Sequence, residues 1–454
     1  MAKDRKSKKS VTIEYLIIGN SAGGIGAAEA IREVDATGAI IIVSDEPYPV
    51  YSRPLISKHL GKGYPLDKIL YRPRDFYDDN YIETILGDRV TGIDFDGHTA
   101  GLESGNTITW NKLLLAPGGK PIVPRMDGLE HEGIFTFSNL DDAKKIGDYL
   151  DRFSRKISAV IIGGGLIGIS AAEALTARGV NITIVEMKDR VLNTILDEEA
   201  SAMEAAALKE AGINIATENT VVKINSIMSG QVSSVSLDSG EQIPCDMVVM
   251  AIGVQPRLEL VADSAVVTDR GIIVNRQMET SVHGVYACGD AVQAYDFIYG
   301  ENRLTPVWPN AYLGGRTAGL NMAGATAEYP GGTALNSMNY FGMDVVSAGV
   351  TVPPDDSYDV VSERKNGVYK KVVTKDGIIT GMVFIGDIEM SGIIYNLMKD
   401  RENVDSFREV LVADDFGLIS LPDELRKQKM AVPESLLAGA ITGIESPEQE
   451  VGAD

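Results

Sequence analysis

Two glycine-rich turns constrain this chain most strongly. They are G-N-S-A-G-G at residues 19–24 and G-G-G-L-I-G at residues 163–168. Each matches the G-x-G-x-x-G pattern of a dinucleotide-binding turn, with serine at the second glycine of the first turn. The glycines permit the tight turn, let a pyrophosphate approach the backbone and let the following helix pack on the strand.

The segments around both turns predict the same supersecondary unit. Each turn follows a short β-branched strand and precedes an alanine-rich helix. In chain order these strands and helices are predicted at 13–18, 24–33, 39–44, 157–162, 169–178 and 181–185. The second strand of each unit ends in an acid, Asp45 or Glu186, where a ribose-binding carboxylate belongs. This repetition predicts two nucleotide-binding domains.

The composition excludes several other classes of protein. The 454 residues suggest two to four domains. A formal net charge of −22 disfavours binding to nucleic acid or to anionic membranes. No apolar run approaches the roughly 20 residues of a membrane span, and the charged start lacks a hydrophobic signal region. We expect a cytoplasmic protein with a disordered basic tail at residues 1–10.

The chain has two cysteines, Cys245 and Cys288. They are too few for an iron–sulfur cluster, which usually needs four thiolates, and we expect no metal site. Cys288 is expected to pack against the nucleotide-binding region rather than to act as a redox thiol.

Three further segments resemble one protein family. They are D-E-P-Y-P-V-Y-S-R-P-L-I-S-K at 45–58, G-V-Y-A-C-G-D at 284–290 and P-V-W-P-N-A at 306–311. With the two glycine turns, and in the same order, they resemble the FAD-dependent pyridine nucleotide-disulfide oxidoreductase superfamily. The resemblance is to its branch of NADH:rubredoxin and ferredoxin reductases, including reductases associated with carbon monoxide dehydrogenase.

The resemblance implies an α/β fold with two Rossmann-like three-layer domains. An FAD-binding domain at 11–120 and 247–325 is expected to be split by an inserted NAD-binding domain at 121–246. A C-terminal α+β interface domain is expected at 326–454. The first glycine turn then belongs to FAD and the second to NAD(H), because FAD segments lie on both sides of the second turn.

The resemblance also assigns residues to the two cofactors. Lys58 is expected near the isoalloxazine as the catalytic residue, and Glu186 is expected to bind the NAD ribose and favour NADH. The expected FAD set is Gly19, Ser21, Ala22, Gly23, Gly24, Asp45, Glu46, Arg53, Lys58, Val90, Ala116, Gly118, Gly289, Asp290, Val307 and Trp308. The expected NAD set is Gly163, Gly165, Leu166, Ile167, Gly168, Glu186 and Gly253.

One departure from the family concerns Lys58. Members often have a glutamate, paired with this lysine, two residues after the third glycine of the NAD turn. Ser170 stands there in this chain. Lys58 is then either unpaired or paired with Glu173.

The cysteine pattern narrows the expected function. The chain lacks the C-x₄-C pair of glutathione-reductase-like enzymes, and it lacks the single cysteine of peroxidase-like relatives near residues 52–55. We expect an enzyme that passes electrons from NADH through flavin to ferredoxin, rubredoxin or a partner iron–sulfur subunit. Two alternatives stay open, an NADH oxidase that uses dioxygen and a flavin-bearing structural or signalling subunit.

The assembly is expected from resemblance alone to be a homodimer. An acidic electron carrier would need basic patches on this acidic chain. The candidate cations are Arg72, Arg74, Arg364, Lys365, Lys370 and Lys371.

Overall fold

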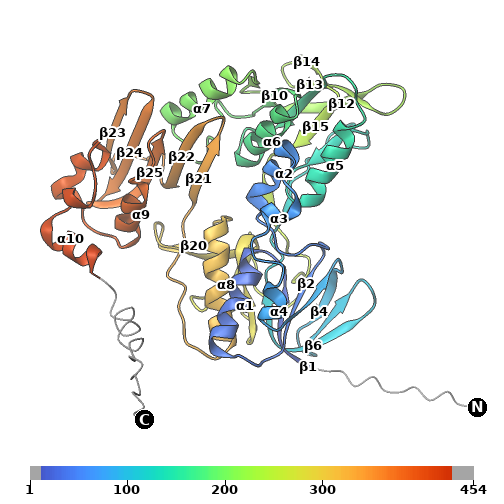
Figure 1. The fold of residues 1–454 in the computed structure, drawn as a ribbon, viewed down its shortest axis with the longest axis vertical. Coiled ribbons are helices and arrows are strands. Elements are labelled where there is room, and N and C mark those ends of the chain that lie inside the picture. The colour runs from blue at the N-terminus through green and yellow to red at the C-terminus, as the bar shows by residue number, and fades with distance from the viewer. Residues whose placement is uncertain (1–11, 432–454) are drawn as a thin grey trace, which may run out of the picture.

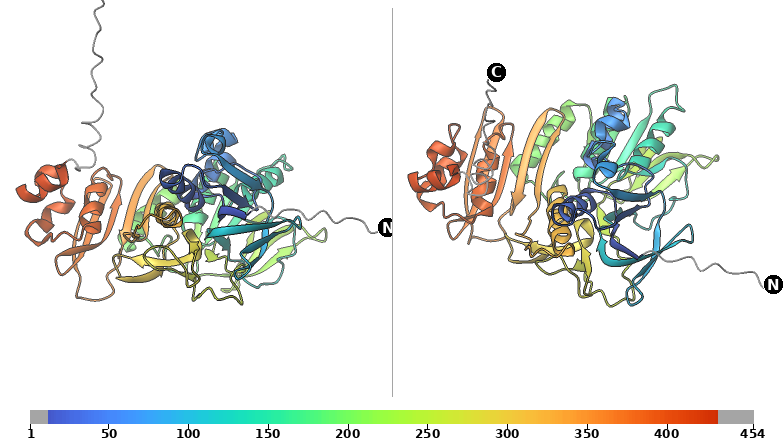
Figure 2. Two further views of the ribbon diagram at one scale, coloured as in Figure 1. Left: turned by 90° about the horizontal axis from the view of Figure 1, so that it is seen from below. Right: turned by 60° about the horizontal axis from the view of Figure 1, so that its bottom comes forward.

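The computed structural model describes residues 12–431 as two nucleotide-binding α/β units and a C-terminal α+β unit (Figure 1). The C-terminal unit lies to one side of the other two (Figure 2). The tail predicted at residues 1–10 lies outside the described residues. Within residues 12–431, no helix is long and apolar enough to span a membrane.

A seven-stranded sheet forms the first unit, in the order β3-β2-β1-β6-β5-β4 with β18 also pairing with β6. The five strands β3, β2, β1, β6 and β18 pair in parallel, as in a doubly wound nucleotide-binding sheet. The strands are β1 (Thr12–Ile18), β2 (Ile40–Ser44), β3 (Ile82–Leu86), β4 (Val90–Asp94), β5 (Thr99–Leu102), β6 (Thr107–Leu115) and β18 (Val285–Ala287).

Helices α1 (Ala22–Val34) and α8 (Trp308–Met322) pack side by side on this sheet (Figure 1). A Cβ on Gly315 would overlap the carbonyl oxygen of Gly23, and one on Gly319 would overlap that of Ala27. Glycines four residues apart on α8 therefore fit against small residues four apart on α1. This close approach holds the end of the first glycine turn against α8.

A five-stranded parallel sheet, in the order β11-β10-β9-β15-β8, forms the second unit. A three-stranded antiparallel sheet, β12-β13-β14, packs beside it. The elements are β8 (Ile134–Thr136), α5 (Leu140–Leu150), β9 (Ser158–Ile162), α6 (Leu166–Ala177), β10 (Asn181–Val185), α7 (Glu198–Glu210), β11 (Asn214–Ala216), β12 (Val221–Ser226), β13 (Val232–Leu237), β14 (Gln242–Pro244) and β15 (Met247–Met250).

The second unit extends further along the chain than the sequence indicated. Strand β15 lies between β9 and β8, although we expected the FAD-binding domain to resume at residue 247. All four residues of β15 are buried, so the strand completes the core of the second sheet. The chain enters and leaves this unit through β7 (Gly119–Pro121) and β16 (Val254–Pro256), which pair antiparallel.

A five-stranded antiparallel sheet, in the order β21-β22-β25-β24-β23, forms the C-terminal unit. Its side chains alternate between two buried faces. In β25, Met382 and Phe384 pack with α9, whereas Val383 and Ile385 join the core of the second unit. The elements are β21 (Leu335–Tyr340), β22 (Met343–Gly349), β23 (Asp359–Lys365), β24 (Val368–Lys375), β25 (Ile378–Ile385), α9 (Ser391–Lys399), η3 (Asp405–Val412), η4 (Leu418–Ser420) and α10 (Asp423–Met430).

A helical excursion from the first unit packs on the second. On helix α2, a Cβ at Gly61 would lie 2.9 Å from the Cα of Ala174 in α6, so the two helices meet closely. The remaining elements are η1 (Arg53–Leu55), α2 (Ile56–Lys62), α3 (Leu66–Ile69), α4 (Phe76–Asp79), β17 (Ile272–Ile273), η2 (Gly289–Ala291), β19 (Val292–Asp296) and β20 (Glu301–Leu304).

Candidate functional site

The first glycine turn lies against the carboxyl end of β6. Gly19 has a φ of 121°, and a Cβ there would overlap the carbonyl oxygen of Ala116. A Cβ on Gly24 would overlap the carbonyl oxygen of Gly19, and one on Gly23 would lie 2.6 Å from the Cys288 sulfur. The three glycines therefore let the turn and helix α1 pack closely on β6, while Ser21 stands at the position that a pyrophosphate approaches in such turns.

The second glycine turn repeats this geometry. Gly163 has a φ of 107°, and a Cβ there would overlap the carbonyl oxygen of Ala251. A Cβ on Gly168 would overlap the carbonyl oxygen of Gly163, whereas the position of a Cβ on Gly165 is open. The two turns are therefore equivalent, and each stands at the carboxyl ends of two parallel strands.

Both turns lead into helices that begin without a side-chain cap. Ser21 before α1 and Gly165 before α6 make no capping hydrogen bond. By contrast, Asn139 caps α5 and Asp197 caps α7. Uncapped N–H groups at the positive end of a helix dipole suit a phosphate. The residues present therefore fit two dinucleotides.

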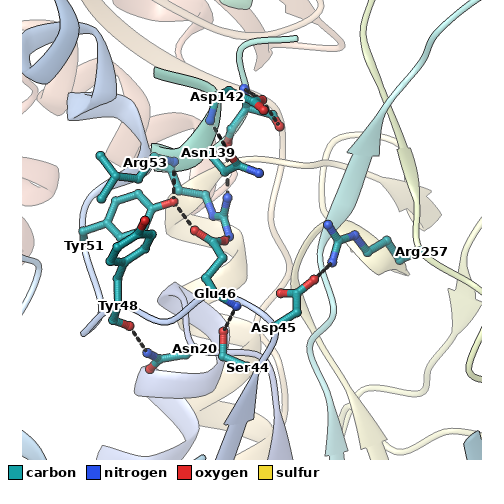
Figure 3. A network of polar contacts seen from close by, with 12 residues as sticks. Asn20, Ser44, Asp45, Glu46, Tyr48, Tyr51, Arg53, Asn139, Asp142 and Arg257 are labelled. Atoms are coloured by element: carbon teal, nitrogen blue, oxygen red, sulfur yellow. Dashed lines mark hydrogen bonds and ion pairs between the residues drawn. The ribbon is translucent and has the colours of Figure 1, made fainter. Parts of the chain in front are cut away.

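Asp45 follows β2 at the same edge of the first sheet (Figure 3). Its Oδ2 accepts a hydrogen bond from Arg257 Nη1 at 2.9 Å and lies 3.5 Å from Arg89 Nη2. Val90 adjoins Arg89 and is buried. Arg257 was not predicted, because it follows the inserted unit and only the fold brings it to Asp45. The carboxylate is thus held between two cations.

Glu46 is the centre of a second polar network (Figure 3). Its carboxylate pairs with Arg53 and accepts a hydrogen bond from the Tyr51 hydroxyl. Arg53 also donates to the carbonyl of Ser138 at 3.2 Å, and the Tyr51 hydroxyl accepts from the Leu140 N–H at 2.9 Å. Ser138 and Leu140 lie at the start of α5, so this network joins the two nucleotide units.

Asp290 reaches this site from the other side of the inserted unit. After β18 the chain turns at Gly289, which has a φ of 78°, into the short helix η2. Burial raises the pKa of the Asp290 carboxyl, and the positive charge of Arg53 opposes this rise. The charge of Arg53 therefore acts on Asp290, although the two residues were predicted from separate motifs.

Asn20 fixes the loop that follows β2, a role that the glycine pattern does not reveal. Its Oδ1 accepts from the Tyr77 hydroxyl at 2.8 Å, and its Nδ2 donates to the carbonyl of Tyr48 at 3.3 Å. The Tyr77 hydroxyl in turn accepts from the Val50 N–H at 2.9 Å. The first glycine turn is thus tied to the segment that carries Tyr51 and Arg53.

The N-terminus of α8 carries the last predicted FAD residues. Val307 precedes the helix, and the ring of Trp308 meets Tyr71 edge to face, with centroids 5.0 Å apart. Trp308 is half-buried. Gly118, just beyond β6, has a φ of 72°. The predicted contacts of these residues with flavin stay predictions.

Glu186 is buried beside the second glycine turn. Its Oε2 accepts from the Gly164 N–H at 2.7 Å and its Oε1 from the Lys188 N–H at 2.8 Å. Gly253, expected nearby, has a φ of 118°. The carboxylate is fixed by backbone groups at the end of β10, where the ribose of a dinucleotide lies in such folds.

Lys58 is paired across the boundary between the two nucleotide units. Its Nζ lies 2.7 Å from Glu173 Oε2, and neither side chain is fully buried. Of the two possibilities left open by Ser170, the structure has the pair with Glu173. The contact follows from the close packing of α2 on α6.

The cations considered for docking an acidic carrier are all paired within the chain. Each of the six cations forms an ion pair with an acidic side chain of the same chain, so none of them is a free positive charge. The pairs are Arg72–Glu29, Arg74–Asp67, Arg364–Glu199, Lys365–Asp414, Lys370–Asp387 and Lys371–Asp197. Among residues 12–431, no cluster of three or more His, Cys, Asp or Glu side chains could hold a metal ion.

Known families match the two nucleotide-binding units and the C-terminal unit. Residues 13–315 match the pyridine nucleotide-disulphide oxidoreductase family, which covers well over half of the chain. The chain belongs to this family. Residues 335–402 match the rubredoxin NAD+ reductase C-terminal domain.

Individual relatives cover most of the chain. The NADH-dependent phenylglyoxylate dehydrogenase subunit epsilon of Aromatoleum evansii is 31% identical over 89% of this chain and 96% of its own. The NADH-rubredoxin oxidoreductase of Clostridium acetobutylicum is 29% identical over 88% of this chain and 98% of its own. A ferredoxin reductase structure from Rhodopseudomonas palustris has a TM-score of 0.75 at 26% identity, over 82% of this chain and 91% of that one. This chain covers only 51% and 49% of the length of two further curated relatives, which are longer proteins.

Membership in this family confirms the predicted α/β fold. It also confirms an NADH-dependent oxidoreductase with FAD and NAD(H) as cofactors. The roles of individual residues at these cofactors stay predictions.

Proposed function

We propose that this chain passes electrons from NADH, through FAD, to an iron–sulfur electron carrier. One observation carries the proposal, namely that the site has no redox thiol. Both cysteines are unpaired and buried. Burial raises the pKa of Cys288, beside the first glycine turn, to about 12, with a further rise from Asp290. The thiol therefore stays protonated, and electrons must leave the flavin directly.

FAD supplies the step that joins a two-electron donor to a one-electron acceptor. The protein's part is to hold both dinucleotides in register. We assign the first glycine turn and Asp45 to FAD, and the second turn and Glu186 to NADH. Glu186 favours NADH because its carboxylate accepts from ribose hydroxyls and repels a 2′-phosphate. The Glu46–Arg53 network and Asp290 then form the part of the site that lies next to the flavin.

Lys58 supplies a fixed positive charge for the reduced flavin in this proposal. At about 4 Å and an effective dielectric near 20, a pair of unit charges attracts by about 4 kcal/mol before desolvation. Glu173 accepts a hydrogen bond from the ammonium group and so orients it. The pair also links α2 of the flavin unit to α6, whose N-terminus faces the nicotinamide nucleotide.

The acceptor is proposed from two of the similar proteins, one named for rubredoxin and one for ferredoxin. A rubredoxin, a ferredoxin or a partner iron–sulfur subunit fits the direct route from the flavin. We further propose a cytoplasmic homodimer, on the basis of resemblance.

Anaerobic stopped-flow mixing of the yellow protein with NADH tests the proposal. We expect bleaching of the flavin, followed by rapid return of colour when oxidised rubredoxin or ferredoxin is added. Fast return with dioxygen and poor transfer to both carriers would identify an NADH oxidase instead. A flavin that NADH does not bleach would mean a structural or signalling subunit.

A further inference from the structure

Helix α7 presents two acidic residues on one buried face. Asp197 at its N-terminus and Glu204 are seven residues apart, which is two turns of the helix. Both are buried, together with Ser201 and Leu208 on the same face. Strands β21 and β22 of the C-terminal unit lie alongside α7 (Figure 1), and both strands contribute to the core that contains Leu208.

Asp197 is fully satisfied in this contact. Its Oδ2 accepts from Lys371 Nζ and from the Tyr369 hydroxyl, both at 2.7 Å, and its Oδ1 accepts from the Ala200 N–H at 3.0 Å. Burial alone would raise the pKa of Asp197, but the hydrogen bonds from Lys371 and Tyr369 outweigh it and the pKa is lowered. Asp197 is therefore ionised and anchors the C-terminal sheet.

Glu204 has no such partners. Its side chain is 0% exposed, and neither carboxylate oxygen makes a hydrogen bond to the described residues. Burial raises the pKa of this carboxyl to about 7. An ionised carboxylate without a hydrogen bond is strongly disfavoured in such surroundings, whereas a neutral carboxyl is tolerated.

The groups around Glu204 do not supply a compensating positive charge. On β21, burial raises the pKa of the Tyr340 hydroxyl most. The negative charges of Glu173 on α6 and of Glu204 raise this pKa further. On β24, Tyr369 and Lys371 are engaged by Asp197. The other charged residues of α7 are Glu198, Glu199, Lys209 and Glu210, of which Glu199 pairs with Arg364.

We infer that docking of the C-terminal sheet on α7 takes up one proton from solvent at Glu204, which makes this contact a pH-sensitive latch. The carboxylate binds the proton as the sheet closes over it and releases it when the sheet lifts. Because the carboxyl's pKa is raised on docking, this contribution is fully present below about pH 4.5 and is lost as pH rises through about 7. Asp197, whose pKa is lowered by the hydrogen bonds from Lys371 and Tyr369, stays ionised as pH rises through about 7.

The latch reaches the flavin unit through Tyr340. This residue stands at the end of β21, where a hydrogen bond with Ser170 of α6 lowers the pKa of its hydroxyl and the charge of Glu173 on the same helix raises it. Glu173 is the partner of Lys58. When the sheet loosens, the ion pair of Lys58 and Glu173 therefore loses Tyr340, its neighbour from the C-terminal unit.

Amide hydrogen exchange on the full-length flavoprotein tests the latch at about pH 6 and about pH 8.5, after correction for intrinsic exchange rates. Between these values, linkage predicts a roughly tenfold loss of docking equilibrium in the wild type. We expect β21, β22 and α7 to lose protection accordingly. In Glu204→Gln, which resembles the neutral carboxyl, protection should stay the same at both pH values.

Two further variants make the result unambiguous. Glu210→Gln removes an exposed carboxylate from the same helix and should keep the wild-type pH dependence. Glu204→Met should abolish the dependence as Gln does, which covers the case in which a buried amide is poorly accommodated. Retention of the wild-type loss in both Glu204 variants, or no loss in the wild type, would overturn the inference.

Discussion

The Nζ of Lys58 lies 2.7 Å from the Oε2 of Glu173, and the two residues belong to different nucleotide-binding units. Related proteins often place the glutamate three residues earlier, where this chain has Ser170. Glu173 is nearly one helical turn further along α6, so the same ion pair is made from a different position. The pair links α2, which carries Lys58, to α6, which begins at the second glycine turn.

The role of Lys58 can be tested by Lys58→Ala. Flavin reduction by NADH should slow about ten- to a hundredfold, or the flavin potential should fall, while FAD stays bound. Lys62→Ala, an exposed lysine on the same helix, is the control and should behave as wild type. If Glu173 acts only through Lys58, adding Glu173→Gln to Lys58→Ala should change neither rate nor potential further. Additive losses would show that Glu173 acts separately.

The nucleotide preference should depend on Glu186. We expect Glu186→Ala to weaken NADH binding about tenfold or more and to weaken NADPH binding much less, because charged hydrogen bonds to the ribose are lost. Titration of the variant with each nucleotide measures the two effects. Asp189→Asn, which removes a neighbouring exposed charge, should leave the preference intact. Equal weakening of both nucleotides would contradict the ribose role.

The packing of α8 on α1 should tolerate little change. Gly315→Ala is expected to destabilise the protein by about 1–3 kcal/mol and to lower FAD content, because its Cβ would overlap the backbone of Gly23. Gly314→Ala on the same helix is the matched control. Its Cβ would come closest to the flexible end of Met278, at 3.1 Å, and would touch the Cys288 Cβ at an ordinary 3.5 Å, so it should cost much less. Thermal unfolding and the ratio of flavin to protein absorbance distinguish them.

The buried ion pair of Lys371 and Asp197 should matter far more than an exposed one. Lys371→Met leaves Asp197 buried and without its cation, and we expect a loss of about 3–5 kcal/mol of stability. Lys365→Met breaks the exposed pair with Asp414 and should have little effect. Equal denaturation midpoints in urea for the two variants would refute this expectation.

Neither thiol should react in the native protein. Burial raises the pKa of both Cys245 and Cys288 to about 12, so the thiolate is scarce at neutral pH. A chromogenic disulfide reagent should report no thiol in native protein at pH 8 and two after unfolding. Cys288→Ala should retain electron transfer. Loss of transfer with FAD still bound would reopen a thiol route.

The sequence predicts the two βαβ units well because apolar strands bounded by glycine carry a strong local signal. Strand β1 and helix α6 begin within one to three residues of the predicted positions. The alternating apolar pattern near the end of the chain also predicts strands at 359–363, 368–373 and 378–384, and β23, β24 and β25 lie close to these ranges.

The misses are tertiary in origin. Strands β21 and β22 were overlooked since β21 is mostly polar, and of its residues only Met338 is buried. The placement of β15 was wrong because a short apolar strand does not reveal which sheet it joins. Arg257 and Asn20 act at their sites through contacts between residues distant in the chain, which local sequence patterns do not reveal. For the same reason the sequence could name Glu173 only as one of two possibilities for Lys58.

The paired strands β7 and β16 attach the inserted unit to the rest of the chain at a single place. Its two ends leave side by side, since the Ile122 N–H donates to the Gly253 carbonyl at 3.0 Å. A short bridge between these two strands would rejoin the two parts of the first unit into one continuous chain, and another domain with two neighbouring ends could be inserted at the same place. The fold thus allows the inserted unit to be replaced while the strands of the first sheet keep their pairing.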